Sequence, residues 1–474
     1  MAQAVINKNK TASVSSGAEN FSAVVSDLAG SVPVPVNENN KKTLISIRNL
    51  KQYFPVKGNK NMFVKANDGI DLDIFEGETL GLVGESGCGK STLGRTLLQL
   101  YAPTEGRTFY YGKPLTAISP KNLTDIIKEL PAEKQELIKL FSTDRKAAQE
   151  LFLDLVRVFG GLLLSPNEDE VTAAYLEYYS EGKTSEDSPD SGSRAETFEA
   201  RRRSIADSSV TDKDNFKRLE KLRDEGIDLT RLTYNEMRRL RRDMQIIFQD
   251  PYSSLNPRMT VGQIIGEGPL AHEFFTGEGE ALQDHVMKIM EECGLAPYMI
   301  HRYPHQFSGG QRQRIGIARS LAVNPKFIVC DEAVSALDVS IQSQILNLLS
   351  ELKEKSNLTY LFISHDLSVI KYISDRIGVM YLGNIVEIAR SEDIFKKPLH
   401  PYTEALLSAI PTTNIDKPKN QIILEGDIPS PINPPKGCKF HTRCRYVSSE
   451  CKETEPLFRE VEPGHFAACH HCLT

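Results

Sequence analysis

The fold of this chain is decided by a glycine-rich stretch, Gly84-Glu85-Ser86-Gly87-Cys88-Gly89-Lys90-Ser91-Thr92. It fits the pattern G-x-x-x-x-G-K-S/T, in which a loop between a strand and a helix surrounds phosphate groups. The apolar run 79–83 before it predicts a buried strand, and the apolar spacing after it predicts a helix. The alternative is an ordinary glycine-rich turn, which would need neither the strand nor the lysine and hydroxyl.

The chemistry predicted for this stretch is phosphate binding. Glycines allow consecutive backbone N–H groups to turn inward, and the helix N-terminus adds the positive end of its dipole. Lys90 can then reach the β- and γ-phosphates of a nucleotide, and the Ser91 hydroxyl is placed to bind Mg²⁺.

The composition is that of an ordinary globular protein, with 474 residues, 40% hydrophobic and 25% charged. The formal net charge is -6, so bulk charge gives no reason to expect nucleic acid as a partner. No stretch approaches the ~18 consecutive apolar residues of a membrane helix. The start of the chain has no apolar core of a signal peptide. Work at a membrane would therefore depend on partner chains.

Changes in sequence character predict the domain organisation. Residues 1–42 are polar without a sustained period, which predicts a disordered tail. Segments 44–50 and 65–74 predict an antiparallel pair of strands, and 106–111 a further strand. Residues 116–232 are rich in Glu, Lys, Leu and Ala, with helical periodicity on either side of a polar run. They predict a mainly helical, partly disordered insertion within a domain that spans 43–410.

Polar side chains follow three of the strands predicted after the insertion. Gln249 ends the first, Asp331 and Glu332 end the second, and His365 follows the third. Strands that alternate with helices predict a parallel sheet covered on both faces. A carboxylate at the C-terminal edge of such a strand lies near the Mg²⁺ of a phosphate site. Helix N-capping is the alternative interpretation of adjacent carboxylates.

Together with Ser308-Gly309-Gly310-Gln311, which opens a predicted helix, and the later Asp338, this order of motifs resembles the nucleotide-binding subunit of ABC transporters. The resemblance covers roughly 44–115 and 233–410 and leaves the insertion outside. The fold that it implies is an α/β P-loop NTPase with a RecA-like core, an antiparallel β subdomain and a helical signature subdomain. The helical insertion and a Cys-rich C-terminal extension, 411–474, are additions to it.

The resemblance also implies the roles of the residues, with ATP as the nucleotide. The implied catalytic set is Glu332, His365, Gln249 and Lys90, and the implied Mg²⁺ ligands are Ser91, Gln249 and Asp331. Glu332 would polarise the attacking water, and His365 would contact the γ-phosphate. Gln249 would also lead into the segment that meets the membrane subunits.

The signature loop implies a partner. In the family it closes on the ATP of an opposing subunit, so that two nucleotides lie between two domains, and Asp338 helps to couple the sites. Here Phe307 stands before Ser308 where leucine is commoner. Phe54 aligns best with the adenine-stacking aromatic, and Tyr53 is the second choice. From the residues alone, either ring could equally close a sheet edge.

The C-terminal part narrows the resemblance, because 398–407 and the cysteine-rich text after it look like the extension of oligopeptide and dipeptide importer ATPases. Five of the eight cysteines lie in this tail. Cys438, Cys444, Cys451 and Cys469 could hold an iron–sulfur cluster or a tetrahedral zinc ion. The resemblance favours a [4Fe-4S] cluster, whereas Cys472 and nearby histidines leave room for zinc. Four free thiols are the third interpretation.

The function that the resemblance implies is ATP hydrolysis that powers uptake of oligopeptides or dipeptides. The implied partners are a related ATPase subunit, two membrane permease chains and an extracytoplasmic peptide-binding protein, with no nucleic acid. The implied location is the cytoplasmic face of the cell membrane, as a peripheral subunit. Two alternatives stay open: an importer for nickel or glutathione, and a soluble ABC-type ATPase without a transport role.

Overall fold

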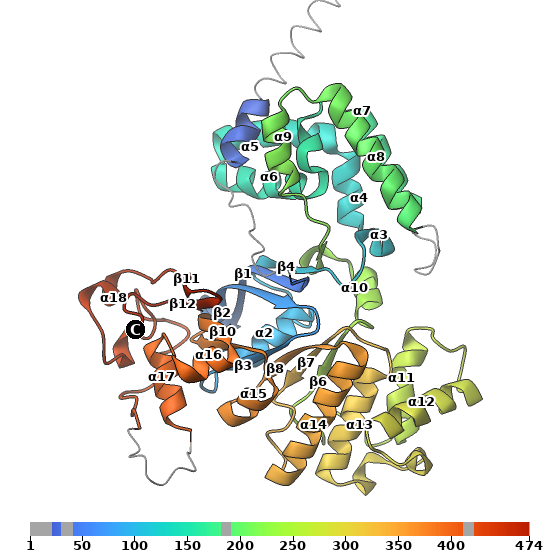
Figure 1. Cartoon of the computed structure of the whole chain (residues 1–474), viewed down its shortest axis with the longest axis vertical. Helices are drawn as coiled ribbons and strands as arrows, with labels where there is room; N and C mark the ends of the chain where they lie inside the picture. Colours follow the sequence, from blue (N-terminus) through green and yellow to red (C-terminus); the bar gives the residue numbers. More distant parts are fainter. Residues whose placement is uncertain (1–20, 30–40, 182–190, 411–420, 474) are drawn as a thin grey trace, which may run out of the picture. The chain divides into compact units, whose positions relative to one another are not determined.

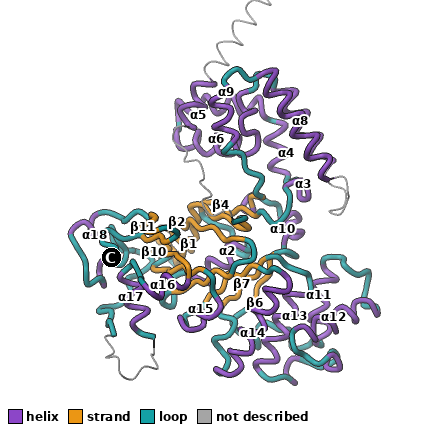
Figure 2. The backbone as a smooth tube through the Cα atoms, in the orientation of Figure 1, coloured by secondary structure: helices purple, strands orange, loops and turns teal. Residues whose placement is uncertain are grey.

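The structure is a computed structural model that describes residues 21–29, 41–181, 191–410 and 421–473 (Figure 1). Its internal contacts divide the chain into two compact units. One comprises Met1–Lys41 with Lys113–Glu236, and the other Lys42–Gly112 with Met237–Thr474. The first unit therefore contains the whole predicted insertion 116–232. The strands gather mainly in the second unit, and helices dominate the first (Figure 2).

A large sheet forms the core of the second unit. Its strand order is β11-β12-β10-β9-β3-β8-β7-β6. The strands are β3 (Thr79–Val83), β6 (Met244–Ile247), β7 (Phe327–Asp331), β8 (Thr359–Ile363), β9 (Arg376–Tyr381), β10 (Asn384–Arg390), β11 (Arg459–Glu462) and β12 (His465–Ala467). The segment from β9 to β6 is parallel. Every residue of β3, β7 and β8 is buried. Since successive side chains point to opposite faces, the sheet is covered on both, as predicted.

A smaller antiparallel sheet comes from the start of the second unit. Strand β1 (Thr43–Val56) pairs with β2 (Asn59–Phe75) on one side and β4 (Glu105–Tyr110) on the other. All three predicted strands of this region are thus confirmed. Asn49, at a positive φ of 48°, lies where the register of β1 shifts against both neighbours. Such a bulge bends the strand without ending it.

Helices cover the large sheet and form the signature region. The helices of this unit are α2 (Lys90–Leu97), α11 (Val261–Ala271), α12 (Glu280–Glu292), η3 (Pro297–Met299), η4 (Pro304–Gln306), α13 (Gly309–Leu321), α14 (Val339–Ser356), α15 (Leu367–Ile373), α16 (Ser391–Lys396), α17 (Pro401–Ser408), η5 (His441–Arg443) and α18 (Ser449–Glu453). The apolar faces of α11 to α17 join one cluster of buried residues with the strands. None of the described helices is long and apolar enough to cross a membrane.

The first unit is almost entirely helical and has its own core. Its elements are α3 (Leu115–Ile118), α4 (Lys121–Lys128), α5 (Leu130–Thr143), α6 (Arg145–Phe159), η1 (Gly160–Leu164), α7 (Glu168–Glu181), α8 (Ser191–Ser209), α9 (Lys213–Glu220), β5 (Ile227–Asp228) and η2 (Leu229–Arg231). The chain leaves this unit within α10 (Tyr234–Leu240). Buried Arg202 lies inside this core and donates hydrogen bonds to Glu220 and the Tyr175 hydroxyl. Part of the predicted polar loop, 182–190, lies outside the described residues.

One prediction about the tail 1–42 is wrong for residues 21–29, which form a helix. Phe21, Val24, Val25 and Leu28 are buried in the core of the helical unit. Asp27 forms an ion pair with Arg145. The spacing of the apolar residues is that of an amphipathic helix. The segment is short and has polar neighbours on both sides in the sequence, so the composition of the tail alone predicts disorder. Residues 1–20 and 30–40 lie outside the described residues.

The C-terminal extension is part of the large sheet rather than a separate body. Strand β12 pairs with β10, opposite Glu387 and Ile388. The Glu387 side chain is fully buried and accepts hydrogen bonds from the N–H groups of Leu399 and His400. The Nε2 atom of His465 lies 2.7 Å from the Oε1 atom of Glu387. Residues 411–420, where this extension was predicted to begin, lie outside the described residues.

Candidate nucleotide-binding site

The loop 84–89 between β3 and α2 has the glycines that its backbone requires. Gly84 and Gly89 have φ values of 151° and 103°. A Cβ atom on Gly89 would lie 2.1 Å from the Ala66 carbonyl oxygen, and one on Gly84 would lie 2.2 Å from the Met380 carbonyl oxygen. A side chain at either position would therefore push the loop away from its neighbours.

Lys90 begins α2 and is 5% exposed. Its Nζ atom donates hydrogen bonds to the carbonyl oxygens of Gly84 at 2.7 Å and Glu85 at 3.0 Å. The ammonium group is thus held inside the curve of the loop. A buried cation at the start of a helix, beside inward amides, suits an anionic phosphate.

Ser91 and Asp331 meet, although they come from distant parts of the chain. The Ser91 hydroxyl donates to the Asp331 Oδ1 atom at 2.5 Å, and Arg95 Nη2 lies 3.1 Å from Oδ2. Asp331 is the last residue of β7 and is buried. A hydroxyl and a carboxylate are oxygen donors of the kind that Mg²⁺ prefers. The pair therefore fits two positions of a magnesium site.

Glu332 is the centre of a second group at the same sheet edge. Its Oε2 atom accepts a hydrogen bond from Gln249 Nε2 at 2.6 Å, and its Oε1 atom lies 3.5 Å from His365 Nδ1. Glu332 has a positive φ of 50°, which costs free energy for a non-glycine residue and is typical of functional sites. Gln249 thus lies against Glu332, and among the described residues it makes no hydrogen bond to the predicted magnesium ligands Ser91 and Asp331.

The predicted signature residues lie at the start of α13. Ser308 caps this helix: its hydroxyl accepts from the Gln311 N–H, and the Gln311 side chain accepts from the Ser308 N–H. A Cβ atom on Gly310 would lie 2.5 Å from Ile341 of α14, whose N-cap is Asp338. The signature loop and Asp338 are therefore neighbours. Among the described residues, no hydrogen bond or ion pair connects them with Lys90.

The two predicted adenine-stacking rings have different surroundings. The Tyr53 hydroxyl donates a hydrogen bond to Asp68, and burial raises the pKa of Tyr53. Phe54 carries no polar group, and its ring meets the Tyr101 ring edge-on at 5.3 Å. Both side chains are half-buried on β1. Neither arrangement distinguishes between base stacking and closure of the sheet edge.

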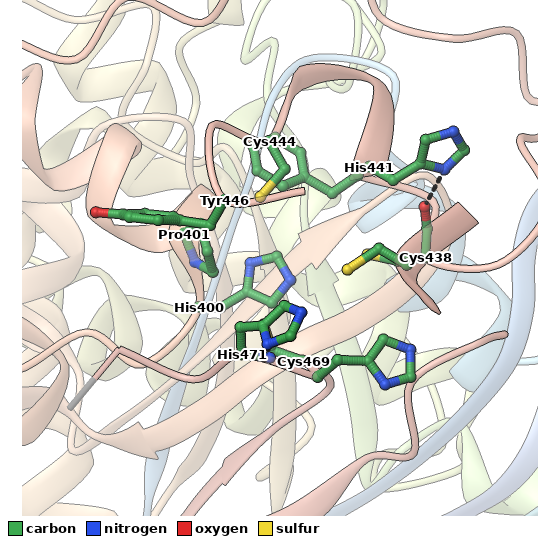
Figure 3. Close-up of a pocket in the computed structure, with 11 residues that line it drawn as sticks. His400, Pro401, Cys438, His441, Cys444, Tyr446, Cys469 and His471 are labelled. Carbon is green, nitrogen blue, oxygen red and sulfur yellow. Dashed lines mark hydrogen bonds between the residues drawn. The ribbon is translucent and has the colours of Figure 1, made fainter. Parts of the chain in front are cut away.

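The four predicted cysteine ligands line one pocket. Its lining residues are His400, Pro401, Cys438, Phe440, His441, Cys444, Tyr446, Cys451, Cys469, His470 and His471. The sulfur atoms of Cys438 and Cys444 point into the same space (Figure 3). Burial raises the pKa of Cys438 to about 11 and that of Cys469 to about 12. Cys472 is not among the lining residues, and its thiol lies 3.7 Å from the Cys469 carbonyl oxygen.

In the structure, the thiols of this pocket are not grouped to bind a single metal ion. Within the described parts of the chain, no three His, Cys, Asp or Glu side chains are grouped closely enough to hold an ion. Among the described residues, this grouping supports neither the predicted iron–sulfur cluster nor the zinc alternative, and both stay predictions.

Sequence reasoning missed the residues that support the loop. Arg443 binds the Glu85 carboxylate, and the Tyr402 hydroxyl accepts from the Glu85 N–H. Nothing in the sequence connects residues so far apart. Arg95 was also missed, although it follows Ser91 by one helical turn and thus lies on the same face of α2.

Comparisons with known proteins show the family of this chain. Residues 67–213 and 216–335 match the family model described as ABC transporter. The chain therefore belongs to the ABC transporter family. Residues 386–451 match a second model, described as the C-terminal region of oligopeptide/dipeptide transporters, which confirms the predicted resemblance of the extension.

Curated relatives match almost the whole chain. The oligopeptide transport ATP-binding protein AppF of Bacillus subtilis is 38% identical over 437 residues, covering 91% of this chain and 98% of the relative. The oligopeptide transport ATP-binding protein OppF of Escherichia coli is 37% identical over 441 residues, covering 91% and 96%. A dimeric ATP-binding cassette, MJ0796 with ADP and phosphate, is a solved structure at 19% identity and a TM-score of 0.45, covering 73% of this chain and 99% of its own.

Proposed function

We propose that this chain is the ATP-hydrolysing subunit that powers uptake of oligopeptides or dipeptides through a multisubunit ABC importer. The observation that supports hydrolysis most directly is the arrangement at the C-terminal edge of the sheet. There Lys90, Ser91 and Asp331 lie around the phosphate-binding loop, and Glu332 lies between Gln249 and His365. The peptide cargo rests on the names of the relatives and on the matching extension.

In the proposed reaction, the loop amides and Lys90 hold the β- and γ-phosphates. The Ser91 hydroxyl and the Asp331 carboxylate hold Mg²⁺, which when bound neutralises charge that develops on the phosphate oxygens. Glu332 polarises the attacking water, while Gln249 and His365 fix the direction of its carboxylate. Phe54, or Tyr53 as second choice, stacks on the adenine.

The proposed assembly contains two ATPase subunits. The signature residues and Asp338, at the starts of α13 and α14, would close on the nucleotide of a second subunit, as the resemblance implies. We propose a related but distinct ATPase chain as that partner. Two permease chains and an extracytoplasmic peptide-binding protein complete the complex. This chain would then lie on the cytoplasmic face of the membrane as a peripheral subunit.

Reconstitution of the complex in proteoliposomes tests this proposal. With the permease chains and binding protein present, a short peptide is expected to stimulate ATP hydrolysis and to accumulate inside the vesicles. Stimulation by nickel or glutathione and not by peptides would favour the related importers. A chain that purifies without permeases and hydrolyses ATP at the same rate with or without them would favour a soluble ATPase.

We further propose that the cysteine pocket holds a [4Fe-4S] cluster, with zinc as the alternative. Each thiolate of such a cluster binds a different iron, whereas a zinc ion draws all its ligands to one point. The observation that supports a shared cluster is that the four cysteines line one pocket. When bound, the cluster would cross-link the loops that carry Cys438, Cys444, Cys451 and Cys469.

Metal analysis of anaerobically purified protein checks the cluster. We expect about four iron and four sulfide per chain, with a brown chromophore that Cys469→Ser removes. Cys472→Ser is the matched control, because this thiol lies close by but outside the pocket lining. It should keep the iron. Stoichiometric zinc in a colourless sample would reject the cluster.

A further inference from the structure

One short segment, residues 438–444, belongs to both the cysteine pocket and the surroundings of the phosphate-binding loop. It begins and ends with a cysteine that lines the pocket. Phe440 fixes it in the fold: this side chain is 2% exposed, and its ring lies 5.2 Å from the Tyr381 ring and 5.3 Å from the Tyr402 ring. Because a buried aromatic side chain with ring neighbours has little freedom, the side chains beside it are also held in place.

Arg443 reaches from this segment to the loop. Its Nη1 atom donates to Glu85 Oε2 at 2.7 Å, and its Nη2 atom donates to Oε1 at 3.0 Å. The Arg443 side chain is only 6% exposed. A bidentate pair between a guanidinium and a carboxylate fixes both direction and distance, which a lysine would not do.

Glu85 in turn is held at three points. Its carboxylate accepts from Arg443, and its N–H donates to the Tyr402 hydroxyl at 2.8 Å. Its carbonyl oxygen accepts from Lys90 Nζ at 3.0 Å. Glu85 therefore connects Arg443 to the lysine proposed to bind phosphate.

Lys439 makes a second connection from the same segment. Its Nζ atom lies 2.8 Å from Asp68 Oδ2, and the other oxygen of Asp68 accepts from the Tyr53 hydroxyl. Asn67, the residue before Asp68, donates a hydrogen bond to the Gly89 carbonyl oxygen at 3.1 Å. Arg443 thus pairs with a carboxylate within the phosphate-binding loop. Lys439 pairs with a carboxylate beside the proposed adenine-stacking rings.

We propose that Arg443 is a positioning residue of the nucleotide site. Arg443 holds Glu85 in place. The carbonyl oxygen of Glu85 in turn holds Lys90 in the arrangement that receives the phosphates. Arg443 also neutralises a carboxylate that would otherwise repel a polyphosphate from within the loop. This inference rests on the proposed nucleotide site and adds to it a residue from the C-terminal extension.

Nucleotide titrations of the full chain test the proposal, with a fluorescent ATP analogue as the probe. Arg443→Gln is expected to weaken binding roughly tenfold, or about 1.4 kcal/mol, because Glu85 and Lys90 lose the contact that fixes them. Glu85→Gln is expected to cost less, because it removes the repulsive charge while the Arg443 cation stays beside the loop. The double variant Glu85→Gln/Arg443→Gln should then bind about as well as Glu85→Gln alone. In ATP hydrolysis, the KM of Arg443→Gln should rise while kcat changes little.

Arg445→Gln is the matched control. This arginine lies two residues on and pairs with Glu404 at 2.7 Å, whereas Arg443 pairs with Glu85 of the loop. Equal affinities of Arg443→Gln and Arg445→Gln would overturn the proposal. So would a double variant that loses the product of both single effects, because a purely structural role is not relieved by removing the Glu85 charge. If the wild-type chain itself bound no nucleotide, the proposed function would fail instead.

Discussion

Replacing Glu332 with glutamine is expected to stop ATP turnover in the assembled transporter while ATP binding is kept. The amide retains the size of the side chain and can still hydrogen-bond to Gln249 and His365, which contact the carboxylate at 2.6 and 3.5 Å. It cannot polarise water as a carboxylate does, so the hydrolysis rate should fall roughly 10²–10⁴-fold. Phosphate release at saturating ATP gives the rate, and titration with an ATP analogue gives the affinity.

Glu351→Gln is the control for this change, because that glutamate is exposed on α14. It should leave both quantities unchanged. Phosphate release at the wild-type rate by Glu332→Gln would show that another group polarises the water.

Replacing Lys90 with methionine is expected to give the largest loss of nucleotide affinity. Methionine fills a similar space but lacks the ammonium group that the carbonyl oxygens of Gly84 and Glu85 hold in place. A hydrogen bond to a charged group contributes about 1.5–3 kcal/mol, so binding should weaken at least about tenfold. Equilibrium titration of the full chain with the ATP analogue measures the effect.

The control Lys396→Met removes a lysine whose side chain is 73% exposed, and it should bind the analogue normally. A thermal unfolding curve close to that of the wild type shows that Lys90→Met is folded. Normal binding by the folded Lys90→Met variant would contradict phosphate binding by this loop.

The sequence predicts the sheet well because buried parallel strands have continuous apolar runs. Strand β3 has the predicted bounds, and β7 and β8 lie where the runs before Glu332 and Ser364 indicate. The helix 21–29 shows the limit of such reasoning. Its side chains are buried by a core that forms from residues 123–222, so its own polar neighbourhood in the sequence predicts the opposite.

The residues of the candidate site also differ in how well the sequence predicts them. Lys90, Ser91, Asp331 and Glu332 belong to local patterns that end a strand or begin a helix, and these patterns also position the side chains. The contact between Arg443 and Glu85 has no such pattern, because 358 positions separate the two residues. The cysteines lie between these cases. Their clustering in the sequence predicted a metal or cluster site, and the four thiols line one pocket, but spacing along loops does not determine how closely they approach.

The segment 438–444 also determines which thiol gives an interpretable variant. Cys444 follows Arg443 directly, and Cys438 precedes Lys439, so a replacement of either cysteine is expected to disturb an ion pair beside the proposed nucleotide site as well. A loss of ATP binding in such a variant would have two explanations, one through the metal and one through the displaced cation. Cys469 lies outside this segment, shortly after strand β12. Its replacement separates the two causes, so a change in nucleotide affinity there would report on the pocket alone.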